Sequence, residues 1–155
     1  MHPLIAKATG TKWNSGERSS DFALDLAKAI KQISDLKPGL TFITTPNNPT
    51  GTCTPIGDIE KMAAATLATN GLLIVDEAYQ EFSNEISAAT LIAKYPNVVV
   101  VRTMSKAFAF AGARVGYAIA DEAMIRAVLV TRLPYHLSSA TQALALVALS
   151  NAKLL

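Results

Sequence analysis

Two short apolar runs constrain the fold more than any other feature of this sequence. Residues 72–75 and 98–101 contain no polar side chain, so neither run alternates between an apolar and a polar face. Strands of this kind are typical of sheets that are covered on both faces. Segments with helical spacing separate these runs from two further predicted strands, residues 40–44 and 115–120. Alternating strands and helices predict a three-layer α/β/α fold around a mostly parallel sheet.

The helix starts are predicted from side chains that favour helix caps. Asp21 is expected to cap the first long helix, whose apolar face would comprise Phe22, Leu26, Ile30 and Ile33. Thr54, followed by Pro55 in the first turn, predicts the start of a second helix. Asp121 and Ser138 predict the starts of two more, the last of them rich in Ala and Leu.

Composition and charge exclude several classes of function. The 155 residues are enough for one domain with a core, and the net charge of +2 comes without a basic cluster, which argues against nucleic acid as a partner. No apolar run reaches the length of a membrane span and no secretory leader is evident, so no membrane role is expected. The single Cys53 fits the reducing cytoplasm. With only two histidines, far apart in the sequence, no metal site is expected.

Polar residues follow two of the predicted strands. Asp76 comes directly after residues 72–75, so it should emerge at the carboxyl edge of the sheet, where α/β proteins bind ligands. A carboxylate there can pair with a protonated pyridine nitrogen and keep the ring of a cofactor cationic. Tyr79, and Asn48 in the loop after residues 40–44, could each donate a hydrogen bond to a phenolic oxygen of that ring. Taken singly, the same residues are also compatible with a turn-capping Asp, a packed Tyr and an ordinary Asn-Pro turn.

Lys106 lies in a loop of small residues after the run 98–101. An amine is the nucleophile that carbonyl chemistry requires. Thr103 and Ser105 precede it and Arg114 follows it, and these side chains could hold a phosphate through hydroxyl and bidentate guanidinium hydrogen bonds. A solvated lysine beside turn hydroxyls and a surface arginine is the alternative for each residue alone. Together with the two upstream loops, the pattern indicates pyridoxal phosphate.

The order and spacing of these motifs resemble the class I/II aminotransferases of pyridoxal-phosphate fold type I. The matching motifs are residues 46–51, 76–79 and 105–108, the last running on to 112–114. Within that family the chain is most similar to the histidinol-phosphate aminotransferase branch, through residues 76–82, 102–108 and 133–138.

The resemblance implies a role for each candidate site residue. Lys106 would be the Schiff-base lysine, and Asp76 would pair with the pyridine nitrogen. The residues implied for the phenolic oxygen are Asn48 and Tyr79, and those implied for the phosphate are Thr103, Ser105 and Arg114. The implied reaction transfers an amino group between L-histidinol phosphate and 2-oxoglutarate, giving imidazole acetol phosphate and glutamate in histidine biosynthesis. The active form of such enzymes is a homodimer.

The resemblance covers the whole chain but only part of a typical family member. It implies that residues 1–155 are a single domain, the central part of the cofactor-binding large domain, without the N-terminal segment and the small C-terminal domain. The isolated piece is therefore expected to lack full turnover. Three other interpretations stay open: an aromatic amino acid aminotransferase, a decarboxylase of a phosphorylated amino acid, and a non-enzymatic ligand-sensing domain of a transcription regulator.

Four further polar residues are predicted to lie outside the chemistry. His2 and His136 are expected in loops or at an interface. Glu77 and Glu81 could serve the site, but a solvated loop is the favoured interpretation.

Overall fold

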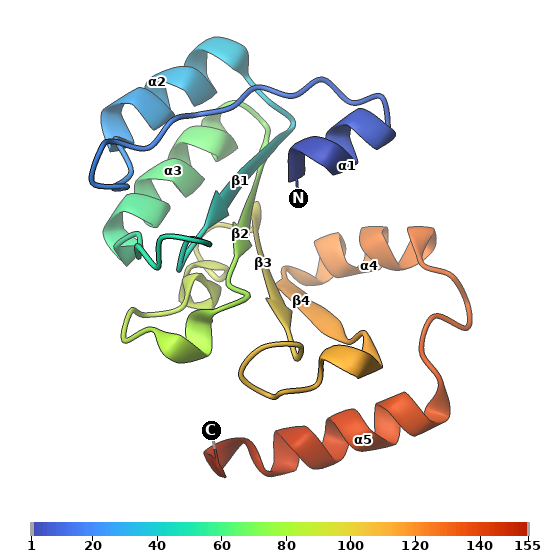
Figure 1. The fold of residues 1–155 in the computed structure, drawn as a ribbon. Coiled ribbons are helices and arrows are strands. Elements are labelled where there is room, and N and C mark those ends of the chain that lie inside the picture. The colour runs from blue at the N-terminus through green and yellow to red at the C-terminus, as the bar shows by residue number, and fades with distance from the viewer. Residues whose placement is uncertain (1, 155) are drawn as a thin grey trace.

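The computed structural model describes residues 2–154 and contains a sheet of four strands (Figure 1). In spatial order these are β1 (Leu40–Thr44), β2 (Leu72–Asp76), β3 (Val98–Thr103) and β4 (Gly116–Ala120). β2 runs parallel to both β1 and β3, and β4 is antiparallel to β3. The predicted α/β fold with a mostly parallel sheet is confirmed.

The register brings the ends of the parallel strands to one edge. Thr44 pairs with Asp76, and Asp76 pairs in turn with Val101. The loops that follow β1, β2 and β3 therefore leave the sheet side by side. β4 approaches this edge closely, since a Cβ atom on Gly116 would lie 2.9 Å from the carbonyl oxygen of Arg102.

Helices lie on both sides of the sheet (Figure 1). One side carries α2 (Leu26–Leu36) and α3 (Ile56–Ala68), and the other carries α1 (His2–Ala8) and α4 (Glu122–Thr131). The last long helix, α5 (Ser139–Ser150), extends past the sheet. Short 3₁₀ helices connect these elements: η1 (Gln80–Phe82), η2 (Ala88–Leu91), η3 (Ala111–Ala113) and η4 (Ala152–Leu154).

The main core lies between the sheet and the helices α2 and α3. Alternate residues of β2 and β3 point into it and have no exposed surface: Leu73, Val75, Val98 and Val100. From the helices they meet Ile33, Ile59 and Met62. Burial of these side chains stabilises the sheet by roughly 1.5–3 kcal/mol for each fully buried aliphatic residue, which explains why the two apolar runs dominate the sequence pattern.

The first long helix begins later than the sequence pattern predicts. Its N-cap is Asp25, whose side chain accepts a hydrogen bond from the backbone N–H of Lys28. Asp21 instead accepts hydrogen bonds from Ser19 and Ala23 in the preceding turn. Phe22 lies outside the helix with a positive φ of 64°, so the prediction that Asp21 caps this helix is wrong.

Of the other three predicted helix caps, two are confirmed and one is wrong. Asp121 caps α4 through the N–H of Ala123, and Ser138 caps α5 through the N–H of Thr141, as predicted. Thr54 makes no cap for α3, where Pro55 occupies the N-cap position without a side-chain bond. The backbone N–H of Thr54 instead donates to the Thr45 hydroxyl, and this bond ties the start of α3 to the end of β1.

No residue of α5 is buried, although the helix is strongly apolar. Its larger side chains, including Leu144, Leu146 and Val147, are exposed. No helix within residues 2–154 is both long and apolar enough to cross a membrane.

Candidate active site

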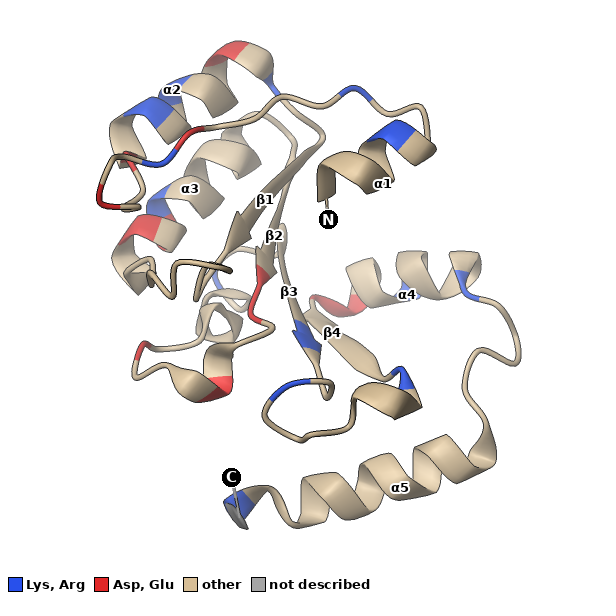
Figure 2. Cartoon of the chain, in the orientation of Figure 1, with Lys and Arg blue, Asp and Glu red and all other residues tan. Residues whose placement is uncertain are grey.

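Three loops carry the predicted site residues away from the carboxyl edge of the sheet. Asn48 lies in the loop after β1, Asp76 and Tyr79 lie at and after the end of β2, and Lys106 lies after β3. Figure 2 shows that this edge is charged, with acidic residues where β2 ends and a basic residue near the end of β3. The topology thus brings together groups that are up to 58 positions apart, from residue 48 to residue 106.

Tyr79 joins the three loops. Its hydroxyl accepts a hydrogen bond of 2.9 Å from the Asn48 side-chain amide. The exposed amine of Lys106 lies 5.4 Å from the centre of the Tyr79 ring, a distance at which a cation is attracted to the ring face. An amide donor, a phenol and a primary amine therefore face the same small region.

The three residues predicted to bind a phosphate do not all lie together. Two of them form a pair, and the third is a separate cation. The hydroxyls of Thr103 and Ser105 lie 2.6 Å apart, and the N–H of Ser105 donates to the Thr103 oxygen at 3.1 Å. Arg114 is exposed in the loop beyond, where it adopts a left-handed backbone conformation and donates to the carbonyl of Ala111. Within residues 2–154, neither Arg114 nor Asp76 shares a hydrogen bond or ion pair with another predicted site residue.

Asp76 is held by its own turn and approached by a histidine. One carboxylate oxygen accepts from the N–H of Ala78 at 3.1 Å, and the other lies 3.6 Å from Nε2 of His2. The His2 ring stacks on Phe42 of β1, with ring centres 4.6 Å apart. The carboxylate keeps 26% of its surface exposed and can still accept a donor. His2 was predicted to lie outside the chemistry; the structure brings it into contact with a candidate site residue.

Two hollows flank this edge. The smaller, of about 300 Å³, is lined by the Asn48 loop together with Cys53, Tyr79 and Phe82. The larger, of about 620 Å³, is lined in part by His2, Trp13 and Phe42, and neither Tyr79 nor Lys106 lines it. Only the smaller one adjoins the Asn48–Tyr79 pair, so volume alone does not mark the centre of this site.

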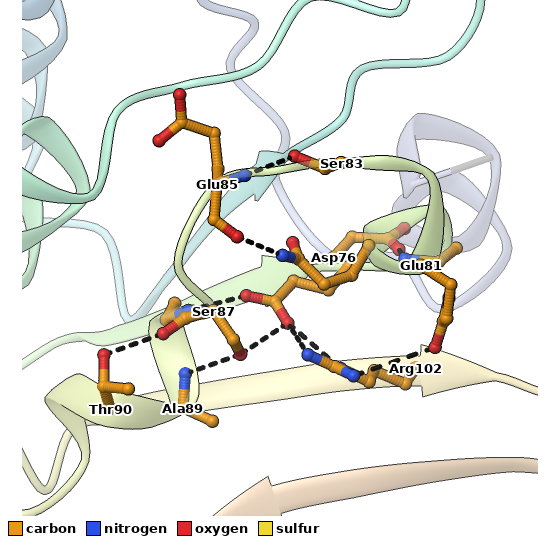
Figure 3. Close-up of polar contacts among 12 residues, drawn as sticks. Asp76, Glu81, Ser83, Glu85, Ser87, Ala89, Thr90 and Arg102 are labelled. Carbon is orange, nitrogen blue, oxygen red and sulfur yellow. Dashed lines mark hydrogen bonds and ion pairs between the residues drawn. The ribbon is translucent and has the colours of Figure 1, made fainter. Parts of the chain in front are cut away.

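Glu77 departs most from its sequence prediction. Its side chain is only 1% exposed rather than solvated. One carboxylate oxygen accepts from the N–H of Ala88, and the other accepts from the Ser87 hydroxyl and from two nitrogens of Arg102, at 3.0 and 2.8 Å. Glu81 is also largely buried, and its Oε1 lies 3.7 Å from Nη1 of Arg102 (Figure 3).

Arg102 remains charged in this partly buried setting. Desolvation by burial acts to lower its pKa, but the interactions with Glu77 and, to a smaller extent, with Tyr117 outweigh desolvation, so the pKa of Arg102 is raised above its usual value. A cation therefore stands between two carboxylates of the segment that follows β2.

We expect Glu77→Ala to destabilise the protein by about 3–5 kcal/mol, because it leaves the partly buried Arg102 guanidinium without its main partner. The loss should be seen as a lower midpoint in urea unfolding. The matched control is Glu122→Ala, which breaks an ion pair with Arg126 between side chains that are 77% and 75% exposed, and which should change the midpoint little. Equal midpoints for the two variants would contradict the assignment of Glu77 to a buried ion pair.

The donor set defines what the site can bind. Hydroxyl, backbone N–H and guanidinium donors suit a phosphate, and the carboxylate of Asp76 suits a protonated ring nitrogen. Among the described residues, no three His, Cys, Asp or Glu side chains lie close enough to hold a metal ion.

The carboxyl ends of the strands carry an amine, a carboxylate and paired hydroxyls. This is the organisation of a ligand-binding α/β enzyme domain. Residues 1–155 match the family described as aminotransferase class I and II. The chain belongs to this family.

Similar sequences include histidinol-phosphate aminotransferases of several bacteria. The histidinol-phosphate aminotransferase of Mycobacterium sp. (strain KMS) is 52% identical over 153 residues, which are 98% of this chain and 40% of the relative. That of Thermobifida fusca (strain YX) is 50% identical over 151 residues, 96% of this chain and 40% of the relative. The chain thus spans about 40% of the length of the curated relatives it matches.

Solved structures support the same fold. The histidinol-phosphate aminotransferase of Sinorhizobium meliloti, in complex with pyridoxal-5'-phosphate, matches with a TM-score of 0.88 and 27% identity over 97% of this chain and 41% of that one. A decarboxylase from Sulfurospirillum multivorans matches with a TM-score of 0.69 and 29% identity over 79% of this chain and 36% of that one. The same core therefore occurs with more than one reaction type, and the reaction must be argued from the site.

Proposed function

We propose that this chain is the central, cofactor-binding part of a pyridoxal-phosphate-dependent histidinol-phosphate aminotransferase. The observation that carries the proposal is the meeting of three loops at Tyr79, which binds Asn48 and lies against the Lys106 amine. The resemblance of the sequence relatives to this chain supports the choice of reaction.

We assign residues 1–155 to the large domain of a longer protein. The assignment rests on the share of each relative that the chain spans, about 40%. It is also supported by the apolar side chains that α5 leaves exposed, since contiguous exposed apolar surface is characteristic of interaction sites. In this proposal the remaining parts of the active site come from segments outside the chain.

The phosphate of the cofactor fits the end of β3. Thr103 and Ser105 offer two hydroxyls 2.6 Å apart, both partly shielded from water. Each can turn its proton toward an anion, since a hydroxyl rotates to suit its partner. The exposed guanidinium of Arg114 keeps N–H donors beyond the one that binds Ala111, and it would complete the set.

The ring of the cofactor fits the ends of β1 and β2. Asp76 would hold a proton on the ring nitrogen, because a neighbouring carboxylate stabilises the protonated form. Asn48 and Tyr79, already hydrogen-bonded to each other at 2.9 Å, would bind the phenolic oxygen. His2, 3.6 Å from Asp76, would lie behind the carboxylate and orient it.

Lys106 would act at the substrate. When bound, pyridoxal phosphate supplies an aldehyde that takes up the substrate amino group and a ring that accepts electrons as the α-proton leaves. The Lys106 amine would remove that proton from the substrate α-carbon and deliver it to the carbon of the cofactor's aldehyde group. The ring of Tyr79, 5.4 Å away, would keep the amine over this position.

The names of the sequence relatives support the proposed amino donor. We propose L-histidinol phosphate as the amino donor and 2-oxoglutarate as the acceptor, and a homodimer as the active form. The single cysteine is consistent with action in the cytoplasm.

A substrate panel tests the reaction. The full-length protein that contains this chain should transaminate 2-oxoglutarate with L-histidinol phosphate and release no carbon dioxide. Assayed beside it, the isolated 155 residues should show little turnover, because groups from other segments are missing. A preference for aromatic amino acids, or carbon dioxide as a product, would replace the proposed reaction. Robust turnover by the isolated chain would overturn the assignment to a partial domain.

A further inference from the structure

We propose that Arg102 is a positioning residue of the cofactor site, which holds the ring-binding and phosphate-binding segments in fixed register by binding Glu77 and Glu81 at once. The inference rests on the proposed function, because it concerns the cofactor assigned there. Arg102 itself is expected to make no contact with that cofactor.

The contacts form a clamp across the ends of β2 and β3. On one side, two guanidinium nitrogens of Arg102 donate to a single oxygen of Glu77 at 3.0 and 2.8 Å. On the other side, its remaining nitrogen, Nη1, lies 3.7 Å from Oε1 of Glu81 (Figure 3). Both carboxylates come from the segment that follows β2, whereas the guanidinium comes from β3.

Each half of the clamp is the chain neighbour of a proposed cofactor ligand. Glu77 directly follows Asp76, and Arg102 directly precedes Thr103. The ladder between β2 and β3 ends here, with the N–H of Glu77 donating to the carbonyl of Val101 at 2.9 Å. Beyond that bond, the Arg102 side chain links the end of β3 to the segment that follows β2 through its contacts with Glu77 and Glu81.

The clamp is itself anchored. Glu77 also accepts hydrogen bonds from Ser87 and from the N–H of Ala88, which fix its carboxylate at the start of η2. A partly buried guanidinium with ligands on two sides has little freedom to move. The distance between Asp76 and Thr103 is therefore set before any ligand binds.

Such preorganisation matters only for a ligand that spans both segments. Binding energy from two linked groups adds fully when their two sites are held at the matching distance, and it falls when that distance fluctuates. Loss of the clamp should thus weaken pyridoxal phosphate more than either of its halves taken alone.

The experiment compares three ligands on the full-length protein and its Arg102→Lys and Arg102→Met variants. Affinities for pyridoxal phosphate, pyridoxal and inorganic phosphate are measured by calorimetry. Lysine keeps the charge but cannot fork between both carboxylates. We expect pyridoxal phosphate to bind roughly 10-fold to 10²-fold more weakly to both variants, with pyridoxal and phosphate nearly unchanged.

The outcomes separate positioning from folding. The control is Arg126→Lys, which alters an exposed ion pair of α4 and should leave all three affinities unchanged. If the three ligands weaken together, or if only the urea midpoint falls, Arg102 is a structural residue and the inference fails. Should Arg102→Met not fold, Arg102→Lys alone decides the question. If the unaltered protein does not bind pyridoxal phosphate, the proposed function fails, and the inference fails with it.

Discussion

Replacing Lys106 with alanine should lower the turnover number of the full-length protein by about 10⁴-fold, the upper range for loss of a positioned acid–base group. The variant should still fold, because the Lys106 side chain is exposed and makes no buried contact among the described residues. Turnover is measured with saturating amino donor and 2-oxoglutarate, so that weaker substrate binding does not obscure the chemical step.

The chain contains a closely matched control for this variant. Lys94 lies 5.2 Å from the centre of the Tyr95 ring, almost the same distance as Lys106 from the Tyr79 ring at 5.4 Å, and its amine also pairs with Glu60 at 2.7 Å. Lys94→Ala should leave turnover unchanged. Borohydride treatment of the cofactor-loaded protein should add the mass of the reduced cofactor to the peptide that contains Lys106. A label on any other peptide would refute the assignment.

The sheet and its functional edge were predictable because they depend on burial of short apolar runs. Residues 72–75 and 98–101 carry no polar side chain, and a strand of this kind can lie only inside a covered sheet. Once their direction is set by parallel pairing, the polar residues that follow them must meet at one edge. This is why Asp76 and Lys106 could be placed in neighbouring loops from the sequence.

The start of α2 was not predictable from local pattern alone. Asp21 and Asp25 are both good caps, and Phe22 fits the helical spacing of the apolar face. The choice is made by the backbone at Phe22, whose positive φ of 64° is incompatible with a helix. That conformation belongs to a turn in which Arg18 donates to the Phe22 carbonyl and also reaches the carbonyl of Thr44. A contact across 26 positions is invisible to a short sequence window.

The burial of Glu77 was missed for a similar reason. An acidic residue in a loop is usually solvated, and only the parallel pairing of β2 and β3 brings it beside Arg102. One signal was available: opposite charges follow the apolar parts of two strands that the fold makes neighbours. Matching the oppositely charged residues at the ends of these two neighbouring strands would have predicted the ion pair. His2 gave no comparable signal, because its approach to Asp76 depends on the placement of α1.

Replacing Asp76 with asparagine should reduce the turnover number by about 10² to 10³-fold, the usual loss when a charge that stabilises the transition state is removed. Asparagine has the same shape and can still accept the hydrogen bond from the N–H of Ala78. What the variant lacks is the negative charge that would keep a proton on the ring nitrogen. Cofactor affinity should fall much less than turnover, because the phosphate-binding hydroxyls of Thr103 and Ser105 are unchanged.

Asp121 provides the control for this charge. Its carboxylate accepts from the N–H of Ala123 at 2.9 Å, the same contact two residues ahead that Asp76 makes with Ala78 at 3.1 Å. Asp121→Asn removes an equal charge from a similar side-chain-to-backbone contact at the start of α4, and because asparagine keeps the acceptor oxygen, neither variant should lose much stability in urea unfolding. Only Asp76→Asn should lose turnover. Full turnover in that variant would mean that no ring nitrogen lies against Asp76, because a bound pyridinium could not stay protonated beside an uncharged amide as it does beside a carboxylate.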